Sequence, residues 1–457
     1  MADPARPTPA QPGRVSRRGL LGAGAALGVA APLAGAGMLP AAADAQNSGW
    51  PRAGKNASVR AAASFLQQVT DTYRTSGPRL AQSFDDSRIS DIAFIYDNAL
   101  TTIALLATGD ETRARAIGDA LLYAQEHDEK FTDGRLRQAY HADTFVNDDK
   151  TAHFGWEFSL TGTAVGDMSW TGLALAQLAR RTGDRRYLDG VVTIGNWIYE
   201  NTYSTTGLGG YTFGETAGLE DHKSTEHNID VYGLFRLLAK LTGKRKWNER
   251  ADHALGFIRR VWNDEDGFFW TGSDDGAAIN KLGTQLPLDV QTWFWMSVGD
   301  DRYAECLDWA QTNLATTDTP LRINSALKGN FRTSGVGFAS GTFRTDVTKK
   351  VGGHDYTPLP DDSAVWYEGT GQLALALRLR GERGDRQAAD DLLAELRAAQ
   401  AELGGTQTFG QKKTTGGVVA ASSPLDTGFQ FDYSQNLHIA ATSWYLFAAL
   451  KFNPYTF

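Results

Sequence analysis

The 457-residue sequence predicts an all-α fold built from repeated helical hairpins. One kind of segment is apolar on nearly every face, as residues 92–107 are apart from Asp97 and Asn98, and such a helix has to be buried. A second kind has apolar residues on one face only. Short turns follow the apolar segments, and longer loops rich in Gly and aromatic residues follow the amphipathic ones. This alternation predicts two concentric rings of helices.

Taken in order, the chain repeats one unit of an outer and an inner helix. After a polar lead-in at 46–57, the outer helices are expected at 59–73, 111–126, 186–200, 247–261, 302–314 and 386–402. The inner helices are expected at 92–107, 167–180, 226–241, 288–297, 364–379 and 435–450. No linker interrupts the repeat, so we expect a single domain over residues 58–457.

The turns after the apolar helices carry the clearest repeat. They read Thr108-Gly109-Asp110, Thr182-Gly183-Asp184, Thr242-Gly243-Lys244, Val298-Gly299-Asp300 and Arg383-Gly384-Asp385. Gly supplies a left-handed C-cap, and Asp or its neighbour begins the next helix. Short turns and long loops should therefore lie on opposite faces, with a functional cleft on the long-loop face.

Residues 1–45 are typical of an export signal. Ser16-Arg17-Arg18-Gly19-Leu20-Leu21 is a twin-arginine signature, and an Ala/Gly/Leu-rich run follows it up to the small-residue site Ala43-Asp44-Ala45. We expect the twin-arginine machinery to export the folded protein to the periplasm or the extracellular space. Cleavage near Ala45 would leave no stable membrane span. The single cysteine, Cys306, excludes an intramolecular disulfide.

Charge and motif content narrow the function classes. A net charge of -8 without a basic cluster argues against a nucleic-acid partner. No compact His/Cys spacing indicates a metal site, and no phosphate loop or dinucleotide fingerprint indicates a cofactor. We therefore expect neither a metal nor a cofactor.

Polar groups crowd the N-terminal ends of the inner helices, which should face the long-loop cleft. In chain order they are Tyr96, Asp97 and Asn98; Asp167, Ser169 and Trp170; Glu226, His227 and Asp230; Asp289, Gln291 and Trp293; Trp366, Tyr367 and Glu368; and Asn436 and His438. Acidic residues suit a helix N-terminus, but capping does not call for Trp and His beside them. The richest entrance precedes the apolar helix that ends at Leu241. The pattern indicates a polar functional site.

A twelve-helix ring with long loops on one face resembles the six-hairpin, or (α/α)6 toroid, glycosidase superfamily, which also includes polysaccharide lyases and sugar epimerases. The resemblance covers residues 59–450 and rests on the architecture, the Gly-Asp turns and the Gly/aromatic loops. It implies a secreted glycoside hydrolase that cleaves a poly- or oligosaccharide by carboxylate general acid/base catalysis. It also implies inversion, because most toroid glycosidases invert.

Glycoside hydrolysis needs one protonated and one ionised carboxyl group. Glu226 is the leading general acid because it lies in the densest polar cluster, and Asp97 is its leading ionised partner. Glu368 and Asp289 compete with them, and Glu215 in the loop at 210–218 is a fifth candidate. The predicted substrate-binding residues are Tyr96, Asn98, Trp170, Glu215, His227, Asp230, Gln291, Trp293, Trp366 and His438. Aromatic residues of the long loops, Trp156 among them, suggest sugar subsites.

Three alternatives remain open at this stage. A lyase of the same toroid class would use Tyr or His as base, but entrances nearly free of Lys and Arg would repel an acidic polymer. An epimerase would want paired His and fits export less well. A non-catalytic glycan-binding toroid would bind without turnover.

Overall fold

The computed structural model describes residues 56–85, 91–155, 161–281, 285–321, 327, 329–341, 349–351, 354–356, 363–427 and 432–457. They belong to one compact unit, Leu39–Phe457. The predicted export signal, the cleavage site near Ala45 and Trp156 lie outside the described residues.

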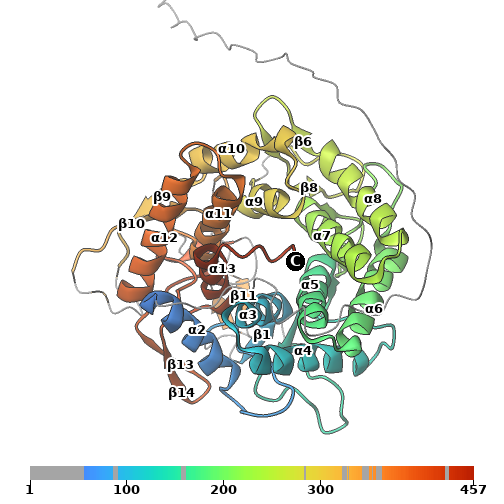
Figure 1. The fold of residues 1–457 in the computed structure, drawn as a ribbon, viewed down its shortest axis with the longest axis horizontal. Coiled ribbons are helices and arrows are strands. Elements are labelled where there is room, and N and C mark those ends of the chain that lie inside the picture. Colours follow the sequence, from blue (N-terminus) through green and yellow to red (C-terminus); the bar gives the residue numbers. More distant parts are fainter. Residues whose placement is uncertain are drawn as a thin grey trace, which may run out of the picture. The chain divides into compact units, whose positions relative to one another are not determined.

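Twelve α-helices alternate between an outer and an inner layer within the described residues (Figure 1). The outer helices are α2 (Ala57–Thr70), α4 (Glu111–Glu126), α6 (Arg185–Thr202), α8 (Lys246–Arg260), α10 (Glu305–Asn313, after the 3-10 turn η2, Asp301–Tyr303) and α12 (Asp385–Glu402). The inner helices are α3 (Ile95–Thr108), α5 (Val165–Thr182), α7 (Thr225–Thr242), α9 (Leu288–Ser297), α11 (Tyr367–Arg380) and α13 (Ile439–Leu450). Each inner helix contacts the next, and α13 contacts α3, so the inner ring is closed.

The long loops contain short antiparallel strand pairs, and each of the first three pairs along the chain connects two different loops. The pairs are β1 (Ile92–Phe94) with β2 (Ala139–His141), β3 (Thr163–Ala164) with β4 (Gly214–Glu215), β5 (Lys223–Ser224) with β8 (Gly272–Ser273), β6 (Trp262–Asn263) with β7 (Phe268–Phe269), β9 (Ala315–Asp318) with β10 (Thr333–Val336), β11 (Lys349–Val351) with β12 (His354–Tyr356), β13 (Thr406–Phe409) with β14 (Lys412–Thr415), and β15 (Leu425–Asp426) with β16 (Asp432–Tyr433). The starts expected for three inner helices, at 92, 364 and 435, are therefore three to four residues too early. Residues just before these helices are extended and pair across loops, as Ile92 does with His141 and Trp366 with Ala421.

Glycine ends four of the inner helices in the left-handed conformation. Gly109, Gly183 and Gly243 have φ of 93°, 68° and 66°, as the Gly-containing turns predict. The fifth turn differs, because Gly381 rather than Gly384 caps α11, and Gly384 instead precedes α12. The two glycines are only three positions apart, so the sequence alone does not distinguish them.

The fourth residue of every inner helix anchors that helix to the loop before it. The side chains of Asn98, Met168, Asn228, Gln291, Thr370 and Thr442 accept a hydrogen bond from the backbone N–H of Ala81, Leu136, Tyr211, Phe269, Val336 and Val418, respectively, over 2.8–3.3 Å. The three amide side chains also donate back to the carbonyl of the same loop residue. This sixfold repeat fixes the first turns. In five of them the second or third residue is acidic: Asp97, Asp167, Glu226, Asp289 and Glu368.

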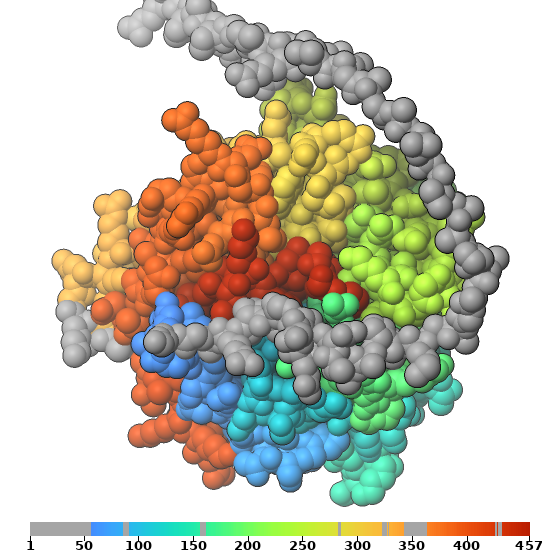
Figure 2. Space-filling model, in the orientation of Figure 1, coloured from blue at the N-terminus to red at the C-terminus, as the bar shows by residue number. Residues whose placement is uncertain are grey.

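The seven residues after α13 enter the ring. Tyr455 packs its ring 5.0 Å from Trp170, and Gln177 donates to the Thr456 carbonyl over 2.8 Å. In Figure 2 the red end of the chain fills the centre between the orange and the green elements. The C-terminal residues therefore pack between the inner helices on this face.

Candidate active site

Five inner helices bring six carboxyl groups together, which we call the carboxyl cluster. Its members are Asp97 on α3, Asp167 on α5, Glu226 and Asp230 on α7, Asp289 on α9 and Glu368 on α11. The charge of Glu226 raises the pKa of Asp167, Asp230, Asp289 and Glu368, and the charge of Asp97 raises that of Asp167 and Glu368. Burial is the larger cause of each shift, but Glu226 acts on four of the other five members and is in this sense central to the cluster.

The helix starts that carry these groups follow ordinary local rules. Ser224 caps α7, where its hydroxyl accepts from the His227 N–H over 3.3 Å. Acidic residues in a first turn are favoured by the helix dipole, which stabilises their charged form by about 0.3–1 kcal/mol. Burial outweighs that effect here, because the pKa values of the cluster shift upward rather than downward.

Burial and mutual repulsion keep protons on the cluster near neutral pH. Burial, aided by the charges of Glu226 and Asp97, raises the pKa of Asp167 to about 8. Burial raises the pKa of Glu226 and of Glu368 to about 7 and holds that of Asp289 well above its ordinary value. A protonated carboxyl group in such a setting can act as a general acid.

Two of the buried carboxyl groups are held by partners from other helices. His438, next to α13, places Nε2 3.0 Å from Asp97 Oδ2, and Asp97 in turn raises the pKa of His438, which favours an ion pair. The Tyr96 hydroxyl donates to Glu368 Oε1 over 2.5 Å and accepts from Trp444 Nε1 over 3.0 Å. These contacts fix both carboxyl groups in position.

Asp230 lies one helical turn after Glu226 and is fully buried. The Tyr455 hydroxyl donates to its Oδ1 over 2.7 Å. Burial holds the pKa of Asp230 well above its ordinary value, and the charges of Glu226 and Asp167 act in the same direction. Asp230 therefore connects the cluster to the C-terminal residues through Tyr455.

The predicted aromatic residues lie deep in the ring. Trp170 and Trp293 are 1% and 2% exposed, and their ring centroids are 5.1 Å apart. Tyr96 packs 5.4 Å from Trp170, beside them. Trp366 is 2% exposed and packs 4.9 Å from Phe338. Burial of this kind gives these tryptophans a packing role, and their contact with sugar stays a prediction.

The other predicted residues divide into members and neighbours of the site. Asn98 and Gln291 are loop anchors, with both amide groups bonded to backbone. His227 is 9% exposed, and burial lowers its pKa to about 4, so its imidazole is neutral. His438 belongs to the site through Asp97. Substrate contact stays a prediction for all four.

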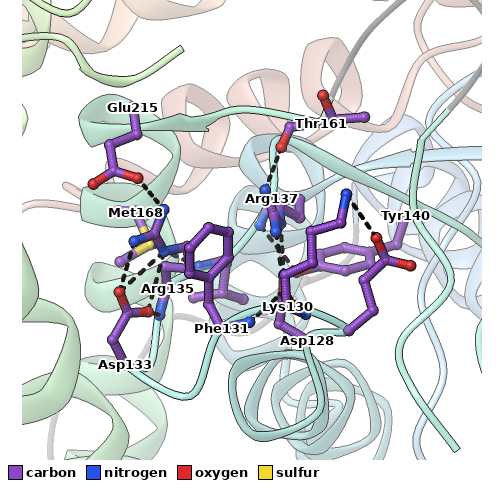
Figure 3. A network of polar contacts seen from close by, with 12 residues as sticks. Asp128, Lys130, Phe131, Asp133, Arg135, Arg137, Tyr140, Thr161, Met168 and Glu215 are labelled. Atoms are coloured by element: carbon purple, nitrogen blue, oxygen red, sulfur yellow. Dashed lines mark hydrogen bonds and ion pairs between the residues drawn. The ribbon is translucent and has the colours of Figure 1, made fainter. Parts of the chain in front are cut away.

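Glu215 is part of a different network, shown in Figure 3. Its side chain is 47% exposed and forms an ion pair with Arg135, whose guanidinium also pairs with Asp133 at 2.7 Å. Phe131 packs against the same guanidinium, 3.6 Å from its ring centre. Arg137 pairs with Asp128 at 2.5 Å in the next part of the loop. This network orders the loop before α5.

Three residues of the site, Asp167, Trp444 and Tyr455, could not be assigned to it from the sequence. Asp167 was recognised at a helix entrance but not ranked, because nothing in the sequence shows how close it lies to Glu226. Trp444 and Tyr455 were given no role, since their contacts with Tyr96 and Asp230 span 348 and 225 residues. Only the first of these had a local signal, an acidic residue in the first turn.

The described residues contain no group of three or more His, Cys, Asp and Glu side chains suited to hold a metal ion. None of their helices has both the length and the apolar character needed to cross a bilayer. A surface pocket between α4 and α6, lined by Asp119, Tyr123 and Arg186 among others, includes none of the predicted site residues.

No family model and no curated protein matches the sequence. Solved structures are similar. A glycosidase variant in complex with glucose has a TM-score of 0.54 at 11% identity and covers 86% of this chain and 96% of its own. The GH76 alpha-mannanase of Bacteroides thetaiotaomicron has a TM-score of 0.53 at 13% identity, and the match covers 87% of this chain and 96% of its own. An alpha-amylase from Clostridium perfringens has a TM-score of 0.53 at 9% identity, and the match covers 86% of this chain and 97% of its own. The chain therefore has the (α/α)6 toroid fold that these glycosidases share, as its sequence predicts.

Proposed function

We propose that the protein is a secreted glycoside hydrolase that cleaves a poly- or oligosaccharide, with Glu226 as one of its two catalytic carboxyl groups. The observation that supports this proposal is the position, exposure and pKa of Glu226. It is partly exposed at the start of α7, central to the carboxyl cluster, and has a pKa of about 7. A carboxyl group that titrates near neutral pH can donate or accept a proton during catalysis.

The comparisons support this proposal at the level of the fold. The similar structures include an alpha-mannanase and an alpha-amylase, so α-linked mannans and glucans belong in a first substrate panel. Inversion rests on the resemblance alone. It requires two carboxyl groups about 6.5–9.5 Å apart, and retention about 5–5.5 Å. Proton NMR of the first anomer released would distinguish the two outcomes.

The test uses the chain from Gln46 onward with a panel of glycans, and mass spectrometry of the products. Hydrolysis adds one water to each cleaved bond, whereas a lyase leaves an unsaturated end. Glu226→Gln should lower turnover by about 10²- to 10⁴-fold with the fold and glycan binding retained. Hydrolysis by this variant at the wild-type rate would remove Glu226 from the mechanism, and binding without turnover by the wild type would favour a non-catalytic toroid.

We also propose export by the twin-arginine route, which the sequence of residues 16–21 supports. Replacing Arg17 and Arg18 with Lys should retain the folded protein in the cytoplasm. The measurement is the fraction of protein outside the cytoplasm for wild type and variant. Normal export of the variant would contradict this route.

A further inference from the structure

We infer that Asp167 is the catalytic partner of Glu226, and that the packing of His227 against Gly166 sets the separation of the two carboxyl groups. This inference rests on the proposed function and deepens it, because it names the second carboxyl group.

Exposure separates these two residues from the rest of the carboxyl cluster. Asp167 and Glu226 are partly exposed, whereas Asp97, Asp230, Asp289 and Glu368 are 3%, 0%, 7% and 2% exposed. A carboxyl group that exchanges a proton with a glycosidic oxygen or with water has to reach it within hydrogen-bond distance. Asp167 and Glu226 meet this condition best.

Three of the buried carboxyl groups also have partners inside the protein. Asp97 lies 3.0 Å from His438, and Asp230 accepts from Tyr455 over 2.7 Å. Glu368 accepts from Tyr96 over 2.5 Å. These three groups are oriented toward protein atoms, and Asp289 is 7% exposed. Asp167 interacts with the Gln138 side chain but is partly exposed, which makes it the most accessible carboxyl neighbour of Glu226.

The first turns of α5 and α7 touch at residues that are adjacent in sequence to the two carboxyl groups. Gly166 precedes Asp167, and His227 follows Glu226. A Cβ on Gly166 would lie 2.5 Å from His227 Cδ2 and 2.7 Å from Nε2, so the imidazole lies directly on the α5 backbone. Phe213 packs 4.4 Å from the same ring. The neutral imidazole thus acts as a spacer of fixed thickness between the helix starts.

The electrostatics suit a catalytic pair. The charge of Glu226 is among the causes that raise the pKa of Asp167 to about 8, and Glu226 titrates near 7. Between these values one carboxyl group of the pair carries a proton and the other is ionised. The protonated group gives its proton to the glycosidic oxygen as the anomeric C–O bond breaks. The ionised group takes a proton from the attacking water as the new C–O bond forms.

The first experiment compares Asp167→Asn with Glu226→Gln. We expect each to lower kcat by about 10²- to 10⁴-fold, with melting temperature and glycan binding close to those of the wild type. If Glu226→Gln is inactive and Asp167→Asn turns over at the wild-type rate, the inference is overturned and the proposed function stands. If both variants keep the wild-type rate, the proposed function fails as well.

The second experiment tests the spacer with a matched control. Gly172 lies two turns further along α5, where an added Cβ would meet Leu234 of α7 at 2.7 Å. Gly166→Ala and Gly172→Ala therefore each add a methyl group that clashes with a side chain of α7. Both variants should lower the melting temperature to a similar extent. Only Gly166→Ala should also lower kcat, by 10-fold or more. Equal kcat values for the two variants would show that the Gly166 contact does not set the separation of the two carboxyl groups.

Discussion

At the scale of the residue, the pKa of a carboxyl group and its exposure decide which acidic side chains can do chemistry. Glu226 and Glu215 were both candidates from sequence, but their surroundings differ. Glu226 is crowded by other carboxyl groups, and its pKa rises to about 7. Glu215 is 47% exposed and paired with Arg135. The difference predicts that a Glu→Gln substitution lowers kcat strongly at position 226 and hardly at all at position 215.

Glu215→Gln should leave kcat within about twofold of the wild type, in contrast to Glu226→Gln. The lost ion pair is partly exposed, so the free energy of unfolding should fall by at most about 1 kcal/mol. Steady-state kinetics and urea unfolding measure both quantities. A loss of kcat as large as that of Glu226→Gln would bring Glu215 back among the catalytic candidates.

At the scale of the element, the fourth residue of each inner helix holds the site in place. Asn228 accepts from the Tyr211 N–H over 2.9 Å and donates to the Tyr211 carbonyl over 3.0 Å, and both residues are buried. The side chain substitutes for a strand partner of the loop backbone. It thereby fixes the turn that carries Glu226 and His227.

Asn228→Ala should lower the free energy of unfolding by about 2–3 kcal/mol, because it leaves two buried backbone groups without partners. Asn201 is a control, since it is exposed on α6 and makes one bond to its own helix, to the Trp197 carbonyl. Asn201→Ala should change stability by about 0.5 kcal/mol or less. Equal losses of unfolding free energy in the two variants would mean that the hydrogen bonds of Asn228 to Tyr211 do not contribute more to stability than the single bond of Asn201.

At the scale of the whole molecule, the closed inner ring forces acidic groups from five helices into one region. The folded state therefore holds protons that the unfolded chain releases. The pKa of Asp167 rises from 3.8 to about 8, and those of Glu226 and Glu368 rise from 4.5 to about 7. Above the unfolded pKa values, stability then falls as pH rises through the folded values.

The melting temperature should fall between pH 7 and pH 8.5, at roughly 1 °C for each kcal/mol in a chain of this size. The raised pKa of His438 acts in the same direction, and His227, with a pKa of about 4, is neutral in the folded state throughout this range. Asp167→Asn should reduce the fall, because asparagine does not titrate. Glu249 is an exposed residue of α8 that pairs with Arg245, so Glu249→Gln should not change the fall of the melting temperature. A melting temperature that rises with pH in the wild type would contradict the protonated cluster.

The sequence by itself determined the alternation of helices, since burial of an apolar helix and Gly termination of a helix are local properties. Residues 226–241 and 288–297 match α7 and α9 within one residue at each end. The sequence also placed Glu226, Asp97, Asp289 and Glu368 at helix entrances, because acidic residues favour the first turn whatever the helix packs against. The all-α ring and the identity of its acidic members thus follow from local rules.

Which of these groups meet, which are buried and what holds them depends on contacts between distant parts of the chain. Asn98 and Gln291 are loop anchors, and Trp170 and Trp293 pack against each other inside the ring. Tyr455 reaches Asp230 across 225 residues. Exposure and pKa depend on neighbours contributed by distant segments, and these are set when the ring closes.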